Sequence, residues 1–204
     1  MTEIYFEPAT ADDVEDIGEW LYETGIELFD YVHGSKAVAT ERLARQWRYP
    51  DGIFSHAHAV FAKIGGQIVG VELGFPSRDT DEIYQKMIAL SGKDYQPHEL
   101  EEIAARAAQI YPMMPSPPRN SYYLQNLVTA PSARGSGAGR ALLNRAFVEA
   151  KKNGLASVHL DVLTSNTARS FYLANGMHDM LESYIPDLVR RIKLPGVIRM
   201  VKDV

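Results

Sequence analysis

Apolar residues recur along the chain with two periods, and each period predicts one kind of element. Apolar residues that alternate or form short runs predict strands, and these fall at residues 4–6, 58–64, 67–75, 124–129, 157–163, 177–185 and 197–201. Apolar residues spaced three or four positions apart predict helices, which fall at residues 10–21, 36–48, 81–90, 97–111, 140–152 and 166–175. Residues 29–34 are interpreted as a loop, and residues 188–191 as a short helix or loop. This mixture of elements indicates an α/β fold.

Two short signals define element boundaries near the N-terminus. Gly65-Gly66 lies between two predicted strands and predicts a two-residue hairpin turn of the primed type, with positive φ at both glycines. Thr10 is interpreted as the N-cap of the first helix, because the acidic residues that the helix dipole favours in a first turn follow it, at Asp12, Asp13 and Glu15. These signals predict a hairpin over residues 58–75 and a helix that begins beside Thr10.

Composition narrows the possible functions. The 204 residues are enough for one domain with a core, or for one domain with an insertion. The chain has no cysteine, which excludes disulfides, thiolate metal sites and a cysteine nucleophile. The net charge of -5 argues against a nucleic-acid partner and is compatible with a cationic or amine substrate. No apolar run approaches the roughly 20 residues that span a bilayer, and residues 1–10 lack the features of a signal peptide. We therefore expect a cytoplasmic protein with no membrane partner.

A glycine-rich turn between a strand and a helix is the main candidate for chemistry. Pro131 ends the strand at residues 124–129, because proline cannot donate to a ladder. The sequence RGSGAG follows at residues 134–139, and a helix begins at Arg140. Glycines let the backbone approach a ligand, and the free N–H groups and dipole of a helix start favour an anion. Arg134 and Arg140 add charged donors suited to phosphate oxygens.

The turn alone does not identify its ligand. The Gly-Lys-Ser/Thr end of a Walker loop is missing, and the glycines at 135, 137 and 139 do not have the Rossmann spacing. Asp161 is the nearest acidic residue at the distance where a Rossmann fold would bind ribose, but it lies inside a predicted strand. A turn that caps a helix and binds no ligand is the simpler alternative.

Two blocks of residues, in order and about 25 positions apart, resemble the Gcn5-related N-acetyltransferase (GNAT) superfamily. The first block comprises Leu127, Pro131, Arg134, Gly135, Gly137 and Gly139. The second comprises Asn166, Ala168, Phe171, Tyr172 and Gly176. Together they cover about a quarter of the chain, and the remaining elements follow the order expected of this family.

The resemblance implies a fold for the whole chain, residues 1–204, as a single acetyltransferase domain. This fold is a mixed, mostly antiparallel, twisted sheet of six to seven strands flanked by helices, in which strands 4 and 5 splay apart. Residues 77–119 depart from the compact form of the family and are interpreted as a helical insertion between strands 3 and 4. The insertion is expected either to cap the acceptor site or to form a contact in a homodimer.

The resemblance also implies a cofactor, acetyl-CoA, as co-substrate. Its pantetheine arm would insert between the splayed strands, and its pyrophosphate would bind the glycine-rich turn. The residues that match the family's cofactor site are Leu127, Val128, Thr129, Arg134, Gly135, Ser136, Gly137, Ala138, Gly139, Arg140, Asn166, Ala168, Phe171 and Tyr172. No metal is expected.

The resemblance gives one catalytic residue a role and leaves another role open. Tyr172 matches the family tyrosine that acts as general acid toward the leaving thiolate, and a phenol with a pKa near 10 is protonated at neutral pH. Glu72 is a tentative general base, although it is equally interpreted as a residue on the solvated face of a half-exposed strand. His159, Asp161 and His33 are further titratable candidates, and a water relay is another alternative. Tyr31 and His33 are candidate substrate contacts or ordinary loop and core residues.

Two classes of function follow from this interpretation. The first is an N-acetyltransferase that transfers an acetyl group directly from acetyl-CoA to a primary amine, expected to be that of a small molecule, with an N-terminus as the alternative. The second is a catalytically idle acyl-CoA-binding module that senses or regulates, and a weaker third idea is a nucleotide binder of the Rossmann kind. The presence of both Tyr172 and the complete turn favours the enzyme.

Overall fold

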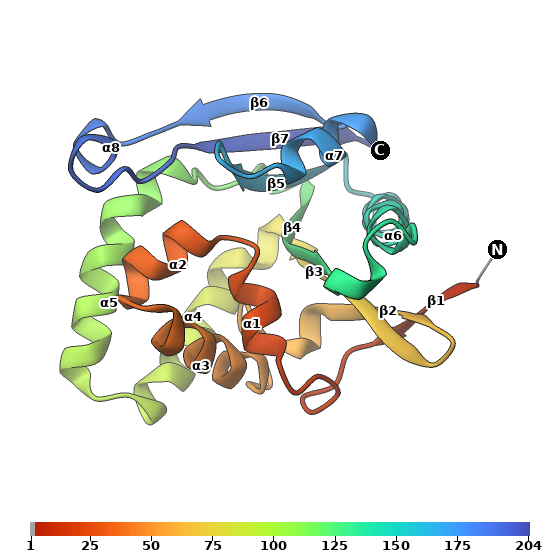
Figure 1. Cartoon of the computed structure of the whole chain (residues 1–204). Helices are drawn as coiled ribbons and strands as arrows, with labels where there is room; N and C mark the ends of the chain where they lie inside the picture. Colours follow the sequence, from red (N-terminus) through yellow and green to blue (C-terminus); the bar gives the residue numbers. More distant parts are fainter. Residues whose placement is uncertain (1–2) are drawn as a thin grey trace.

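A seven-stranded mixed sheet runs through the molecule in the order β1-β2-β3-β4-β5-β7-β6 (Figure 1). The computed structural model describes residues 3–204. The strands are β1 (Ile4–Pro8), β2 (Ala59–Ile64), β3 (Gln67–Pro76), β4 (Ser121–Thr129), β5 (Ser157–Leu163), β6 (His178–Ser183) and β7 (Val197–Asp203). Every neighbouring pair is antiparallel except β4 and β5, which are parallel. The predicted mixed, mostly antiparallel sheet is confirmed.

Helices cover both faces of the sheet. They are α1 (Ile17–Tyr22), α2 (Ile26–His33), α3 (Lys36–Trp47), α4 (Thr80–Asp94), α5 (Pro97–Ile110), α6 (Ala138–Lys152), α7 (Ala168–Ala174) and α8 (Pro186–Ile192). On one face α6 contacts β3, β4 and β5, while α1 and α3 pack together on the other (Figure 1). The alternation of β-strand side chains explains this arrangement, because successive residues point to opposite faces.

Two apolar clusters hold these layers together. On one face, fully buried Leu143 of α6 packs with Val158 and Leu160 of β5. On the other face, Ile17 and Leu43 pack from α1 and α3 onto the sheet, which contributes Val71, Leu73 and Phe75. Burying one such side chain stabilises the fold by about 1.5–3 kcal/mol. The two clusters therefore fix one helical layer to each face of the sheet.

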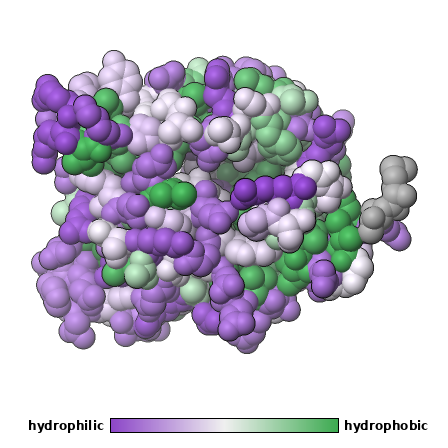
Figure 2. Space-filling view, in the orientation of Figure 1, coloured by the Kyte–Doolittle hydropathy of each residue, from purple (hydrophilic) through white to green (hydrophobic). Residues whose placement is uncertain are grey.

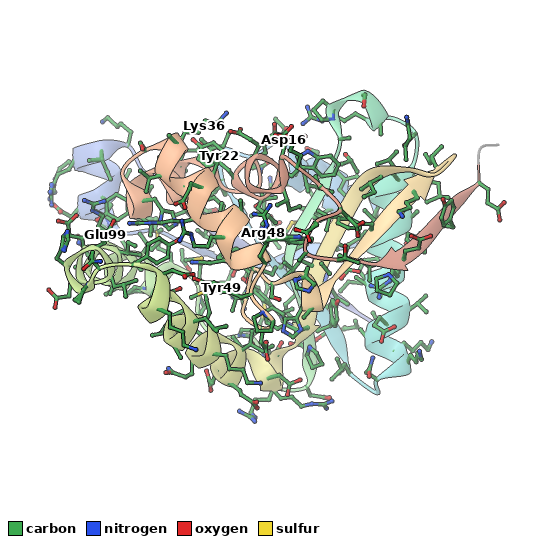
Figure 3. All side chains as sticks on the ribbon, turned by 90° about the horizontal axis from the view of Figure 1, so that it is seen from below. Asp16, Tyr22, Lys36, Arg48, Tyr49 and Glu99 are labelled. Atoms are coloured by element: carbon green, nitrogen blue, oxygen red, sulfur yellow. The ribbon has the colours of Figure 1, made fainter. Side chains whose placement is uncertain are left out.

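The insertion between β3 and β4 is helical, as the sequence predicts. It contains α4 and α5 and returns through a proline-rich stretch at residues 112–118. Polar contacts join it to the region around α3, where Tyr49 donates to Asp94 at 2.6 Å and Arg42 pairs with Glu99 at 3.3 Å. Figure 3, seen from below, places Tyr49 and Glu99 where the insertion meets this helical layer.

Two sequence predictions near the N-terminus are wrong. The first helix begins at Ile17 rather than beside Thr10, because residues 11–16 form turns in which the Thr10 N–H donates to Asp13 at 3.1 Å. Residues 29–34 are not a loop, since α2 continues to His33. Gly34 ends α2 in the left-handed conformation with φ 85°, which glycine adopts without steric cost.

Other boundaries agree with the sequence more closely. Gly65 and Gly66 have φ values of 57° and 84°, so the predicted primed hairpin turn is confirmed. The segment at 188–191 lies within α8. Among residues 3–204, none of the helices combines the length and the apolarity that crossing a membrane requires.

Candidate functional site

The candidate site begins where β4 and β5 separate. The two strands pair at only three positions, Ser121 with Ser157, Tyr122 with Val158 and Tyr123 with His159. Beyond these pairs β4 continues to Thr129 and β5 to Leu163. A cleft of about 450 Å³ opens between them, and Figure 2 shows the surface hollowed between the β5–β7–β6 side and α1. The splay of strands 4 and 5 is therefore present in the described residues.

An irregularity in β4 lies inside this cleft. Leu73 of β3 pairs with Asn126, but the next residue, Gly74, pairs with Leu124. Gln125 is the extra residue on β4, which is the pattern of a β-bulge. A bulge leaves a residue unpaired in the ladder and redirects its neighbours. Leu124, Gln125 and Asn126 all line the cleft, so the bulge presents backbone groups to it.

The glycine-rich turn continues from the end of β4 into α6. Gly135 and Gly137 have φ values of 84° and 91°, a region where a side chain would be strained. A Cβ added to either glycine would meet no atom within 4 Å, so the space beside the turn is open. The Ala138 N–H is bonded to Ser136 Oγ at 3.3 Å, and the other N–H groups at this helix start can face an anion.

The two arginines of the turn differ in their partners. Arg134 pairs with Glu23 across the cleft, with Nη2 and Oε2 3.2 Å apart. Arg140 forms no ion pair or side-chain hydrogen bond with any residue that the structure describes. The Arg140 guanidinium can therefore donate to a ligand at the turn, and the Arg134 guanidinium can do so once it leaves Glu23.

The opposite wall of the cleft comes from α7 and the loop before it. Asn166 Oδ1 accepts from the Ala168 N–H at 2.8 Å and so fixes the helix start. Tyr172 is 8% exposed and lines the cleft. Its hydroxyl has no hydrogen-bond partner within residues 3–204. Burial raises its pKa well above the usual range, so the phenol is protonated at neutral pH and its O–H is a free donor.

Most residues predicted for a cofactor site come together here. Those lining the cleft are Leu127, Val128, Thr129, Arg134, Gly139, Asn166, Ala168, Phe171 and Tyr172. The others continue into the turn and the first turn of α6: Gly135, Ser136, Gly137, Ala138 and Arg140. The two sequence blocks therefore form the two walls and one end of a single cleft.

Glu72 lies elsewhere, and its interpretation as a residue on a solvated face is wrong. It is 1% exposed and does not line the cleft, because its side chain faces α6. Tyr122 donates to Glu72 Oε1 at 2.6 Å, and Arg145 of α6 bonds to Oε2. Desolvation raises its pKa, although Arg145 and Tyr122 oppose this effect. The geometry makes Glu72 an anchor for α6 and removes the basis for its tentative role as a base.

Asp161 and His159 lie on the face of the sheet opposite Glu72, where β4 and β5 separate. Asp161 lines the cleft, and Arg199 bonds both of its oxygens at 2.6 and 2.8 Å. Tyr123 donates to the same carboxylate at 2.8 Å. His159 is 2% exposed, and burial together with Arg199 lowers its pKa. Asp161 is part of the cleft wall and its charge is balanced by Arg199, whereas His159 is buried and does not line the cleft.

Tyr31 and His33 are not brought to the cleft. Tyr31 packs with the apolar cluster where the insertion meets α8. His33 Nδ1 is buried without a partner among the described residues. Burial, Arg42 and Arg106 lower its pKa to about 4. Neither residue lines the cleft, so the substrate contacts suggested for them lack support from the geometry.

The sequence interpretation missed several polar residues of the cleft. Glu23 and Thr24 enter it from the end of α1, and Asn126 donates to Thr24 Oγ1 at 2.7 Å. Gln125-Asn126, two consecutive polar residues inside an otherwise apolar strand, is the one signal that could have indicated them. No such signal marks Glu23, because the α1 stripe resembles that of any amphipathic helix.

The structure contains no obvious metal-binding constellation in the part of the chain that it describes, residues 3–204. Within them, no group of three or more His, Asp or Glu side chains is arranged to hold a metal ion.

Comparisons with known proteins identify the fold and the family. The model of the acetyltransferase (GNAT) family matches residues 19–177. A crystal structure titled as an acetyltransferase is similar over 98% of this chain and 99% of its own, at 19% identity and TM-score 0.66. An N-acetyltransferase from Staphylococcus aureus Mu50 is similar over 97% of this chain and 100% of its own, at 13% identity and TM-score 0.70. A mosquito arylalkylamine N-acetyltransferase like 5b is similar over 99% and 100%, at 19% identity and TM-score 0.56. No curated protein matches the chain.

Proposed function

The chain belongs to the acetyltransferase (GNAT) family, and we propose that it transfers the acetyl group of acetyl-CoA directly to a primary amine of a small molecule. One observation carries this proposal. Arg134 and Gly139 of the glycine-rich turn line the same cleft between β4 and β5 as Tyr172. The transfer needs a site for the coenzyme phosphates and a proton donor for the leaving thiolate. The glycine-rich turn is suited to the first role and the Tyr172 hydroxyl to the second.

The turn fits the phosphates of a coenzyme. Gly135 and Gly137 leave open space beside the backbone, and the helix start favours an anion. Arg140, without a partner among the described residues, adds a charged donor suited to phosphate. Arg134 becomes available when it leaves Glu23, because their exposed ion pair is weak.

The edge of β4 fits the extended arm of the same molecule. Past Tyr123 its backbone groups have no partner on β5 in the described residues, and an extended ligand can bond to such an edge as an added strand. Gln125 to Thr129 all line the cleft. Bound there, acetyl-CoA supplies a thioester carbonyl for attack by the amine.

The transfer needs two proton movements. The amine nitrogen forms a bond to the thioester carbon and loses a proton, and the carbon–sulfur bond breaks to leave a thiolate that takes a proton. Tyr172 is proposed as the donor of that second proton, because its hydroxyl is protonated and has no competing acceptor among residues 3–204. The first proton is proposed to leave through water, because no histidine lines the cleft, Asp161 is bonded to Arg199 and Glu23 is paired with Arg134 in the structure.

The experiment that tests this proposal is a thiol-release assay with acetyl-CoA and a panel of small primary amines, run with wild type and Tyr172→Phe. Amine-dependent thiol release by wild type supports the proposal. Acetyl-CoA binding without turnover on any amine would instead support the catalytically idle sensor. Displacement of coenzyme by ATP or NAD at similar concentrations would favour a general nucleotide site.

The acceptor is proposed to enter from the side of α1 and α2. Glu23 and Thr24 line that side of the cleft, and the insertion packs against the outer side of α2 and α3. The insertion therefore supports the acceptor side indirectly. A role as cap or as homodimer contact remains a proposal that sedimentation of the intact protein would test.

A further inference from the structure

Four carboxylates lie on the segment from α1 to α2, and one differs from the rest. Glu19, Glu27 and Asp30 do not line the cleft. Their partners belong to neighbouring structural elements: Lys36 for Glu19 at 2.6 Å, Ser165 for Glu27 at 2.8 Å and Tyr22 for Asp30 at 2.8 Å. Glu23 lines the cleft, and its partner is Arg134 of the glycine-rich turn, at 3.2 Å. The only one of the four that faces the cleft is therefore held by the proposed phosphate site.

Arg134 has two competing uses. It pairs with Glu23 in the structure, and under the proposed function it faces the pyrophosphate. The pair is weak, because the two side chains are 64% and 43% exposed. Phosphate oxygens carry more charge than one carboxylate and match the guanidinium fork. Phosphate binding should therefore draw Arg134 away from Glu23.

The rest of the cleft determines what a released Glu23 would do. The charged residues that line it are Glu23, Arg134 and Asp161. Asp161 is already bonded to Arg199 through both oxygens. Thr24, next to Glu23, is held to β4 by Asn126 at 2.7 Å, which fixes this segment against the strand. Once Arg134 leaves, Glu23 is the unpaired negative charge on the acceptor side of the cleft.

We propose that Glu23 is a specificity-determining residue that binds a cationic group of the acceptor, and that phosphate binding at the turn releases it for this purpose. This inference rests on the proposed function. The nitrogen that attacks the thioester must be neutral, so the charge that pairs with Glu23 belongs to a second cationic group. The acceptor class is therefore an amine with an additional positive charge, and the coenzyme binds before it.

The first test is calorimetric titration of acetyl-CoA into wild type, Glu23→Gln and Glu19→Gln. Glu19 is the matched control, because it lies one turn earlier, is equally exposed and forms its ion pair outside the cleft. Glu23→Gln should bind acetyl-CoA about two- to five-fold more tightly, because Arg134 no longer has a competing partner. Glu19→Gln should bind as wild type does. Equal affinities for wild type and Glu23→Gln would overturn the inference.

The second test compares two acceptors of equal chain length, a monoamine and a diamine, in the thiol-release assay. Glu23→Gln should raise KM for the diamine about three- to ten-fold and leave the monoamine unchanged, since an ionic contact is lost only with the diamine. Glu23→Asp should restore part of the loss. Tighter acetyl-CoA binding with an unchanged diamine KM would also overturn the inference, because Glu23 would then only oppose the phosphates.

The two tests distinguish a failure of the proposed function from a failure of the role proposed for Glu23. If wild type neither binds acetyl-CoA nor releases thiol, the proposed function fails and this inference fails with it. If wild type is active and the Glu23→Gln variant matches it in both tests, only the inference fails.

Discussion

The carboxylates of Glu72 and Asp161 lie on opposite faces of the sheet. Each is bonded to a tyrosine and an arginine, but only Asp161 lines the cleft. Adjacent residues of β4, Tyr122 and Tyr123, donate to Glu72 and Asp161 at 2.6 and 2.8 Å. An arginine completes each cluster, Arg145 on α6 for Glu72 and Arg199 on β7 for Asp161. We call these the Glu72 cluster and the Asp161 cluster.

The difference between the clusters lies in what covers them. The Glu72 cluster lies under α6, away from the cleft, whereas the Asp161 carboxylate forms part of the cleft wall. Arg145 is 24% exposed and Arg199 only 5%. Neither cluster contains a buried polar side-chain atom that lacks a partner among the described residues. A buried, bonded carboxylate therefore indicates structure as readily as chemistry, and only the cleft separates the two cases.

The largest effect expected is the loss of stability in Asp161→Ala. Arg199 would remain buried without its carboxylate, and removal of one partner from a buried ion pair costs about 3–5 kcal/mol. Urea unfolding followed by circular dichroism measures this loss. A smaller loss of unfolding free energy in Asp161→Ala than in Glu72→Ala would contradict the ranking of the two clusters.

Tyr172 sharpens the comparison, because this buried tyrosine has no carboxylate partner among the described residues. Tyr172→Phe should lower turnover about 100-fold through loss of the proton donor, with stability and acetyl-CoA affinity nearly unchanged. Tyr123→Phe should instead lose stability, because it removes a hydrogen bond to a charged group. The thiol-release assay and urea unfolding, applied to both variants, measure this contrast. Unchanged turnover in Tyr172→Phe would remove Tyr172 from the mechanism.

Glu72→Ala should have a smaller effect on stability. Arg145 can turn toward water because it is partly exposed, so the cost is mainly the unpaired Tyr122 hydroxyl and amounts to about 1–3 kcal/mol. Turnover per folded molecule should stay near wild type, because Glu72 does not line the cleft. A selective loss of turnover without loss of stability would return Glu72 to the list of candidate bases.

The smallest effect expected is the pH dependence of stability that His33 and His159 contribute. Burial lowers the pKa of His33 to about 4 and also lowers that of His159. The folded state therefore binds fewer protons than the unfolded state, so the stability contributed is present above pH 6.5 and is lost as the pH falls toward 4. His33 should contribute a loss of about 1 kcal/mol at pH 5.5. Urea unfolding at pH 7.5 and 5.5 should show a shallower dependence in His33→Gln, and an equal slope would contradict this assignment.

The sequence was most informative where a local signal determines geometry. The glycine triplet, Gly65-Gly66 and the alternating run at residues 157–163 each specify a backbone conformation, and the structure has all three. The splayed sheet followed from the resemblance carried by residues 127–139 and 166–176 rather than from periodicity. Its confirmation therefore supports that resemblance.

The sequence was least informative where tertiary contacts decide. Residues 29–34 break the helical pattern, and α2 has no side-chain N-cap because Gly25 occupies that position, so no local signal in the sequence indicates this helix. Glu72 reads as a polar residue on a strand, and only the packing of α6 explains its burial. Glu23 meets Arg134 across 111 positions, and no local pattern indicates such a pair.

The most direct test of the central claim is calorimetric titration of acetyl-CoA into wild type and Gly137→Glu. The added side chain would strain the backbone at φ 91° and place bulk and negative charge beside the turn. We expect micromolar binding to wild type that disappears in a variant whose circular dichroism remains native. Absence of binding to folded wild type, or equal binding to the folded variant, would contradict the assignment of the turn and cleft as the coenzyme site.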